Sequence, residues 1–368
     1  MYTINKAKET MTSKERVRRT LALDVPDRVP IDYEYNITVH RKLKEALGLK
    51  ADSPDDDLKE LLGVDFRGIN VSYVGKPLFP EIPGLNVGPE YGFYTRWIEN
   101  EYGGYSDYCH FPLKGAESEQ IAAHPVPNPD DYNYEIIPEL VKKYKDKAIY
   151  VGNAGISDII NTLGFIMGME DALVNLQLED EGTLEYLEKK TNFELGKMER
   201  TLDAIKKAGG EADFMWLGED LGTQIAPMVG MPLFRNIIKP IKKRFVELAD
   251  AYNIPTMIHT CGSSSWAYED FIEIGIKAVD TLQPEARNMA PAYLAEKFGG
   301  RLSFHGCIST VALADLTADG VDAYCKKTLD IMMPVRGYHF SPTHQIQDNT
   351  PIENIVAMYN AAHKYGVY

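Results

Sequence analysis

Short apolar segments alternate with longer amphipathic segments along most of this chain. Six such apolar segments follow residue 126, and they span residues 148–154, 213–220, 255–261, 278–283, 302–307 and 337–341. A helical pattern separates each of them from the next. Strands that are joined through helices pair in parallel and are connected by right-handed crossovers. The repetition therefore predicts an α/β fold that is built on a parallel sheet.

Two further strands are predicted in the first part of the chain, at 28–35 and 64–74. A helix that starts at Thr12, with Glu15 completing a capping box, precedes them. Eight strand–helix units close into a (β/α)8 TIM barrel, which can accommodate the 368 residues of this chain as one domain over 1–368. A doubly wound open sheet is the alternative, because periodicity alone does not distinguish the two folds.

The segment 75–126 interrupts the alternation after the second predicted strand. It is rich in proline, glycine and aromatic residues, and Gly103 and Gly104 stand between two tyrosine-rich runs. A glycine pair between such runs is typical of a β-hairpin. We expect a β-rich insertion that lies over one end of the barrel.

Charge and composition exclude several classes of protein. The net charge is -15, with 39 basic and 54 acidic residues, which argues against binding to nucleic acid. There is no run of 18 apolar residues, so we expect no membrane span. The first ten residues contain no apolar core of a signal peptide, and the expected location is cytoplasmic. Four cysteines in such a chain indicate thiols or metal ligands rather than disulfides.

A candidate metal site falls at the ends of two alternate strands. His259 and Cys261 are two residues apart, so they share one face of a strand, and Cys307 ends the strand two units later. Alternate strands of a barrel contribute side chains to a common layer, so the three can converge. One imidazole and two thiolates suit zinc. Glu219, at the end of another strand, is predicted as a catalytic group that serves as fourth ligand or is displaced by substrate.

Other polar residues also fall at predicted strand ends. His305 shares a face with Cys307, and we expect it to act in catalysis by orienting a ligand. The remaining residues of this kind are candidates for substrate contacts, because barrel enzymes bind substrates at these ends. They are Asp32, Asn153, Asp220, Gln283 and His344.

Several of these segments resemble one protein family. The likeness covers most of the chain and is strongest from about 213 to 365. It rests on MTSKERV at 11–17, PDRVPID at 26–32, IHTCG at 258–262, LQPEA at 282–286, FGGRL at 298–302 and PTHQIQDNTP at 342–351. Together these motifs resemble uroporphyrinogen decarboxylase-like proteins, a family of (β/α)8 barrels.

The resemblance implies one of two activities. One branch of the family decarboxylates a porphyrin precursor without a cofactor, and an Arg-rich segment is expected after its first strand. The other comprises zinc methyltransferases that serve corrinoid proteins, and its His-x-Cys…Cys zinc pattern falls on His259, Cys261 and Cys307. This chain has DYEYN at 32–36, which lacks arginine. An acidic segment there would repel a substrate with many carboxylates.

The predicted function is therefore zinc-dependent methyl transfer. The methyl group would pass between a small substrate, a methoxylated aromatic (O-demethylation) or a thiol, and a corrinoid (cobalamin) that a partner protein supplies. Three alternatives stay open: a uroporphyrinogen decarboxylase of porphyrin biosynthesis, a zinc lyase or hydrolase on the same barrel, and a non-catalytic binding protein with a structural zinc.

Overall fold

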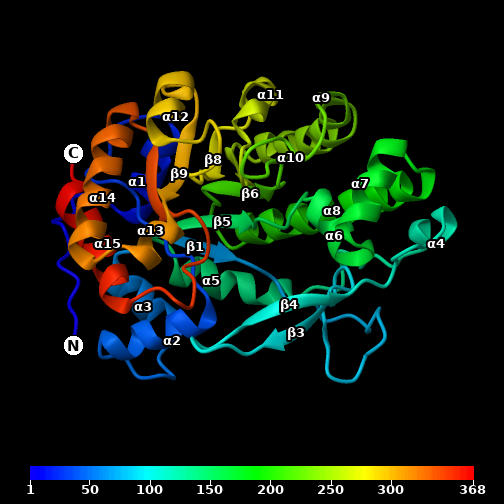
Figure 1. Ribbon diagram of the computed structural model, residues 1–368, viewed down its shortest axis with the longest axis horizontal. Helices are drawn as coiled ribbons and strands as arrows, with labels where there is room; N and C mark the ends of the chain where they lie inside the picture. Colours follow the sequence, from blue (N-terminus) through cyan, green and yellow to red (C-terminus); the bar gives the residue numbers. More distant parts are fainter.

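A strongly curled sheet of seven parallel strands forms the centre of the protein (Figure 1). The computed structural model describes residues 1–368. The strands neighbour one another in chain order, and they are β1 (Phe66–Ile69), β5 (Ala148–Gly152), β6 (Phe214–Gly218), β7 (Thr256–Thr260), β8 (Ala278–Thr281), β9 (Ser303–Ile308) and β10 (Tyr338–Pro342). An open doubly wound sheet reverses its strand order at one point, whereas this order never reverses. The predicted α/β barrel is confirmed, and the open-sheet alternative is excluded.

The segment 30–32 lies between the two edge strands of this sheet. Phe340 in β10 donates its N–H to the carbonyl of Pro30 at 2.8 Å, and Asp32 donates to the carbonyl of Phe340 at 3.0 Å. On the other side, Asp65 donates to the carbonyl of Ile31 at 2.9 Å. The predicted strand 28–35 is thus reduced to isolated bridges, and Pro30 lacks the N–H that a longer ladder would need.

A buried ion-pair cluster fixes this closing segment. The Asp65 carboxylate accepts from Arg16 Nη1 at 2.6 Å, from Arg28 Nη1 at 2.7 Å and from the N–H of Ile31 at 2.8 Å. Burial by itself would raise the pKa of Asp65, but the two guanidinium groups outweigh it and hold that pKa below its ordinary value. Asp65 therefore stays ionised and connects the first helix, the closing segment and β1.

The helix that carries Arg16 covers the amino-terminal end of the barrel. α1 (Ser13–Leu21) begins after Thr12, whose hydroxyl accepts from the N–H of Glu15 at 3.1 Å, as the sequence predicts. Val17 and Leu21 of this helix pack in one apolar cluster with Phe66, Phe214, Met257 and other inward-facing strand residues. The barrel interior is thus closed at this end.

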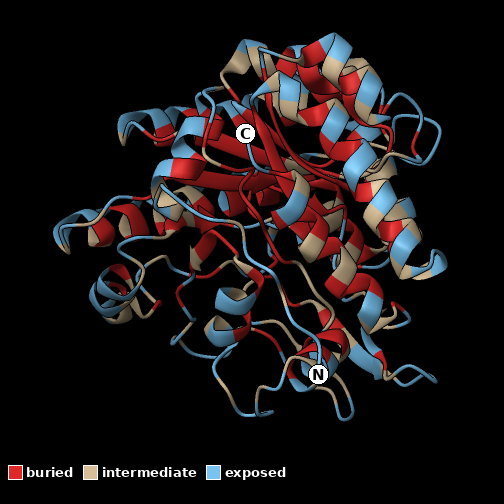
Figure 2. Ribbon diagram, turned by 90° about the vertical axis from the view of Figure 1, so that its left-hand side faces the viewer, coloured by how far each residue is buried: buried red, intermediate tan, exposed pale blue.

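The other helices surround the sheet, and their inner faces are buried (Figure 2). They are α2 (Ile37–Ala46), α3 (Asp55–Leu62), α4 (Ser118–Ala122), α5 (Ile137–Lys143), α6 (Ile160–Met167), α7 (Met169–Leu178), α8 (Glu181–Lys207), α9 (Met231–Leu233), α10 (Lys239–Ala251), α11 (Tyr268–Ile274), α12 (Pro291–Phe298), α13 (Thr310–Asp315), α14 (Ala318–Met332) and α15 (Ile352–Tyr365). None of these helices combines the length and the apolar character that a membrane span requires.

A small antiparallel sheet lies between β1 and β5 in the chain. It consists of β2 (Asn86–Val87), β3 (Tyr94–Ile98) and β4 (Tyr105–His110), and Figure 1 shows β3 and β4 running beside the barrel. The tip of the β3–β4 hairpin bonds to two loops at the carboxyl end of the strands. Asn36 Nδ2 donates to the carbonyl of Gly104 at 3.2 Å, and Asn100 Nδ2 donates to Asp348 Oδ2 at 2.8 Å.

Replacement of Asp65 tests its part in closing the barrel. Asp65→Ala leaves two buried guanidinium groups without this carboxylate, and breaking a buried pair costs about 3–5 kcal/mol. We expect a loss of stability near the lower end of this range, because Arg16 also binds Asp27 and Arg28 also binds Glu9. Chemical denaturation at neutral pH measures the loss. The folded pKa of Asp65 is depressed, so its contribution is present above the unfolded pKa of about 3.9 and disappears as the pH falls through the folded pKa.

The exposed Asp52, whose side chain makes no hydrogen bond or ion pair, provides the matched control. Asp52→Ala should change the free energy of unfolding by less than about 0.5 kcal/mol. A loss of under about 1 kcal/mol in Asp65→Ala would contradict the assigned role.

Candidate metal centre

Three potential metal ligands converge at the carboxyl ends of β6 and β7. His259 lies in β7, Cys261 follows this strand, and Asp220 follows β6. Their ligand atoms all lie within 4.8 Å of one another. His259 Nε2 is 3.3 Å from Cys261 Sγ and 3.7 Å from Asp220 Oδ1. The parallel register, which pairs Gly218 with His259, sets the two strand ends at this level.

The donor set fits zinc. It offers one nitrogen, one sulfur and one oxygen, and zinc in catalytic sites commonly takes three protein ligands and leaves a fourth position open. Asp220 is held in place by the N–H of Cys261 at 2.8 Å and by Asn161 Nδ2 at 2.8 Å. Asp220 is one of the predicted substrate contacts, and the structure places it next to two predicted metal ligands.

Asp280 orients the imidazole of His259. Its Oδ2 is 2.7 Å from His259 Nδ1, and the hydroxyl of Thr281 is 2.8 Å from the same nitrogen. Metal-binding histidines commonly donate their second ring N–H to a carboxylate in this way. Burial would lower the pKa of His259, but the negative fields of Cys261 and Asp280 outweigh it and raise this pKa. His259 Nε2 is therefore the ring nitrogen that faces the cluster.

His305 extends the same hydrogen-bonded chain across the barrel. Its Nδ1 is 2.6 Å from Asp280 Oδ1, and its Nε2 is 3.2 Å from Asp32 Oδ2. Burial lowers the pKa of His305, but Asp280 and Asp32 raise it to about 10. The chain Asp32–His305–Asp280–His259 thus links one predicted substrate contact to the metal cluster. Sequence analysis identified Asp32 and His305 but missed Asp280, although a carboxylate inside an apolar strand was the signal.

The barrel mouth is acidic around this chain. Burial and the negative charges of Asp32 and Asp280 raise the pKa of Glu34 to about 8. Desolvation is the largest cause of this shift, and the two carboxylates add to it. Glu34 is therefore mostly protonated at neutral pH.

Glu219 does not reach the cluster. Its buried carboxylate accepts from Lys242 Nζ at 2.6 Å and from the N–H groups of Ile159 and Ile160 at 3.1 and 3.0 Å. These bonds attach the end of β6 to the start of α6. The carboxylate beside His259 and Cys261 is Asp220, and the predicted role of Glu219 as a fourth ligand has no support in this geometry.

Cys307 also stands outside the three-residue cluster. Its thiol is fully buried, which raises its pKa, and its backbone has a φ of 68°. The hydroxyl of Tyr324 donates to its carbonyl at 3.0 Å. Of the two predicted thiol ligands, only Cys261 joins the cluster.

The three other predicted contacts lie around the mouth. Gln283 Oε1 accepts from the N–H of Gly262 at 2.7 Å and so supports the loop after Cys261. Asn153 is exposed, and its Oδ1 accepts from the N–H of Gly155 at 2.8 Å. His344 is exposed on the loop after β10.

A buried carboxyl near the centre gives a pH-dependent stability. Burial and the charge of Glu219 raise the pKa of Asp158 to about 7. The folded state therefore binds a proton that the unfolded state releases at about pH 4, and the free energy of unfolding falls as the pH rises from about 4 to 7. Asp158→Asn keeps an acceptor for the N–H of Thr162, and in this variant the free energy of unfolding should change less between about pH 4 and 7. Urea unfolding across this pH range measures the free energy of unfolding.

Asp24→Asn changes an exposed position without a side-chain hydrogen bond. In this control the free energy of unfolding should depend on pH as it does in the wild type. An unchanged slope in Asp158→Asn would show that another group causes the pH dependence.

Comparisons with known proteins agree with this architecture. The structure of a methyltransferase from Methanosarcina mazei superposes with a TM-score of 0.65 and 18% sequence identity, over 97% of this chain and 99% of that one. At this identity the likeness shows a shared fold. None of the curated proteins compared with this chain matches it. The family model described as "Uroporphyrinogen decarboxylase (URO-D)" matches residues 118–365, well over half of the sequence. The chain therefore belongs to the uroporphyrinogen decarboxylase (URO-D) family.

Proposed function

We propose that this protein is a zinc-dependent methyltransferase that moves a methyl group between a small substrate and the corrinoid of a partner protein. The substrate would be a thiol or a methoxylated aromatic compound. The observation that carries the proposal is the convergence of His259, Cys261 and Asp220 at the carboxyl ends of the barrel strands. This is the end at which barrel enzymes place their chemistry. The fold shared with a methyltransferase adds support by analogy, which is the weaker argument.

His259 and Cys261 are two zinc ligands in this proposal, and Cys307 is the third, as the sequence pattern predicts. Asp220 lies beside the first two ligands and is the carboxylate that a substrate would displace. When bound, zinc would lower the pKa of a substrate thiol or polarise a methoxy oxygen. Two thiolates balance the charge of the ion, and such a site favours sulfur nucleophiles over activation of water.

The remaining groups position this centre. Asp280 holds His259 Nδ1, so that Nε2 is directed toward the metal position. His305 binds the other oxygen of Asp280 and is itself fixed by Asp32. The chain therefore limits rotation of the imidazole through three consecutive hydrogen bonds. Rigid support of this kind increases metal affinity and keeps the ligand geometry constant.

The acidic mouth argues against decarboxylation of a porphyrin precursor. Asp32 and Asp280 lie there, and the segment 32–36 contains no arginine that could bind the carboxylates of such a substrate. A polycarboxylate substrate would meet repulsion at the point where it needs cations. A neutral thiol or a neutral methoxyaromatic compound meets no such barrier.

Paired variants test the zinc ligands. We expect about one zinc per chain in the wild type and loss of zinc in both Cys261→Ser and Cys307→Ser. Asp220→Asn should retain the metal. The matched control is Cys325→Ser, which changes another buried thiol, on α14. Zinc content after dialysis measures binding, and the thiolate charge-transfer absorption of the cobalt-substituted protein counts the sulfur ligands.

The opposite pattern, with zinc kept by Cys307→Ser and lost by Asp220→Asn, would give the third ligand position to Asp220. Wild-type protein that contains no zinc and does not take it up would contradict the proposed function.

The activity is tested with free corrinoids as substitutes for a partner. The zinc-loaded protein is incubated with methylcobalamin and 2-mercaptoethanol, and separately with reduced cobalamin and guaiacol. In the first reaction the thiol loses a proton, its sulfur gains the methyl group, and the electron pair of the broken bond remains with the corrinoid. We expect methylated product in one reaction and none with Cys261→Ser, measured by mass spectrometry and corrinoid absorbance. Release of CO2 from uroporphyrinogen instead would establish the decarboxylase.

A further inference from the structure

A cavity lies at the opposite end of the barrel from the metal centre. It has a volume of about 1080 Å³, opens to solvent, and is lined by α1, the ends of α8 and α10, and the segments that lead into four strands. Asp213, Pro255 and Lys277 directly precede β6, β7 and β8. The volume is sufficient for a small organic molecule, for which pockets of about 300–1,000 Å³ are usual.

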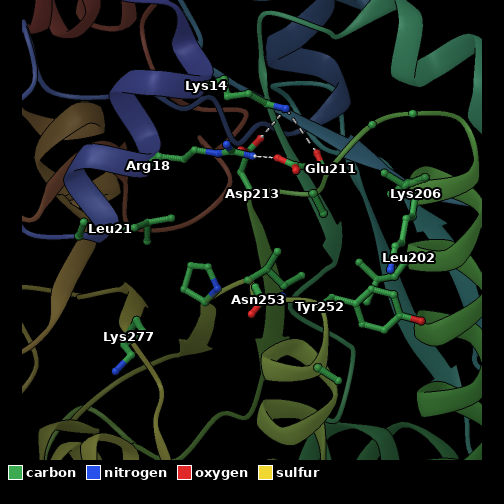
Figure 3. A pocket seen from close by; sticks show the side chains of 18 of the residues that line it. Lys14, Arg18, Leu21, Leu202, Lys206, Glu211, Asp213, Tyr252, Asn253 and Lys277 are labelled. Atoms are coloured by element: carbon green, nitrogen blue, oxygen red, sulfur yellow. Dashed lines mark hydrogen bonds and ion pairs between the residues drawn. The ribbon is translucent and has the colours of Figure 1, made fainter.

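The carboxylates of this cavity are already neutralised. Arg18 binds Asp213 through Nε and Glu211 Oε2 through Nη2, the latter at 2.8 Å, and Lys14 Nζ lies 3.9 Å from Asp213 Oδ2. Figure 3 shows these four side chains gathered on one side. Glu211 and Asp213 therefore leave no unpaired negative charge in the cavity.

Two lysines supply positive charge that no acidic group balances. Lys206 and Lys277 line the cavity, and neither forms an ion pair or a side-chain hydrogen bond. In Figure 3 they lie on different sides of the view. Arg301, which also lines the cavity, is paired with Glu269 at 2.7 Å. The C-terminal ends of α1, α8 and α10 also line the cavity and offset part of the charge of the two lysines, and the remaining balance is positive.

Apolar side chains complete the cavity. Leu21, Leu202, Ile205 and Ile254 are almost fully buried, and each contributes to the lining. The ring of Tyr252 stands beside them (Figure 3). Apolar surface and a small number of placed polar groups are the usual composition of a site for organic ligands.

We propose that this cavity binds an organic monoanion with an apolar body, such as a sulfonate, carboxylate or phosphate ester on a hydrophobic group. One of the two lysines, which lie on different sides of the cavity, would contact the anionic group, and the leucine and isoleucine side chains would contact the apolar body. The site does not depend on the metal centre, because strands β6, β7 and β8 and the packed barrel interior separate the two.

The probe is 8-anilinonaphthalene-1-sulfonate, compared with its uncharged analogue N-phenyl-1-naphthylamine. We expect saturable binding of the sulfonate by fluorescence, and the double variant Lys206→Gln/Lys277→Gln should weaken it about tenfold, as two screened charge contacts allow. The uncharged analogue should bind the wild type and the double variant equally. Ala251→Trp, at an exposed position that lines the cavity, should block both probes.

The matched control is Lys50→Gln/Lys76→Gln, which removes two exposed lysines outside the cavity. Its sulfonate affinity should equal that of the wild type, and thermal unfolding verifies that every variant is folded. Equal weakening by both lysine pairs, or tight sulfonate binding in Ala251→Trp, would overturn the proposal. A zinc-free Cys261→Ser protein should still bind the sulfonate, so failure of the proposed function leaves this test intact.

Discussion

The carboxylate of Asp65 holds together three parts of the chain that are distant in sequence. Arg16 comes from α1, Arg28 precedes the closing segment, and Ile31 lies within it. Residues 30–32 bridge β10 and the start of β1 through backbone hydrogen bonds, and this buried ion-pair cluster anchors the bridging segment. The same contacts place Asp32 at the mouth, where it binds His305. The position of Asp32 in the candidate site therefore depends on the Asp65 ion-pair cluster, which lies outside that site.

Register along the parallel sheet then determines which side chains meet. His259 pairs with Asp280, and Asp280 pairs with His305, so the three lie at one level of three adjacent strands. Their side chains point into the barrel and form a continuous hydrogen-bonded series. The buried ion pair between Glu219 and Lys242 has a different role. It connects the end of a strand to a helix, and it does not face the candidate metal site.

Much of this fold follows from sequence pattern, whereas the site follows only in part. Apolar segments of five to eight residues between helical segments predict most of the strands, and the capping box at Thr12 predicts the start of α1. His259 and Cys261 are predictable because two residues on one strand share a face. Asp280 was missed because strand spacing does not reveal which neighbour will face an imidazole. Cys307 adopts a positive φ, which the strand pattern does not indicate, and Glu219 has a partner, Lys242, that only the tertiary structure reveals.

The charges at the two ends of the barrel make the molecule electrically polar. Asp32, Asp220 and Asp280 lie at the carboxyl end of the strands, and the unpaired Lys206 and Lys277 lie at the amino end. Helices of a βα barrel run opposite to the strands, so these carboxylates are on the side of the helix N-termini and these lysines on the side of the helix C-termini, an arrangement that stabilises both. The peptide dipoles of the helices and the charged side chains therefore favour the same orientation of charge along the barrel axis.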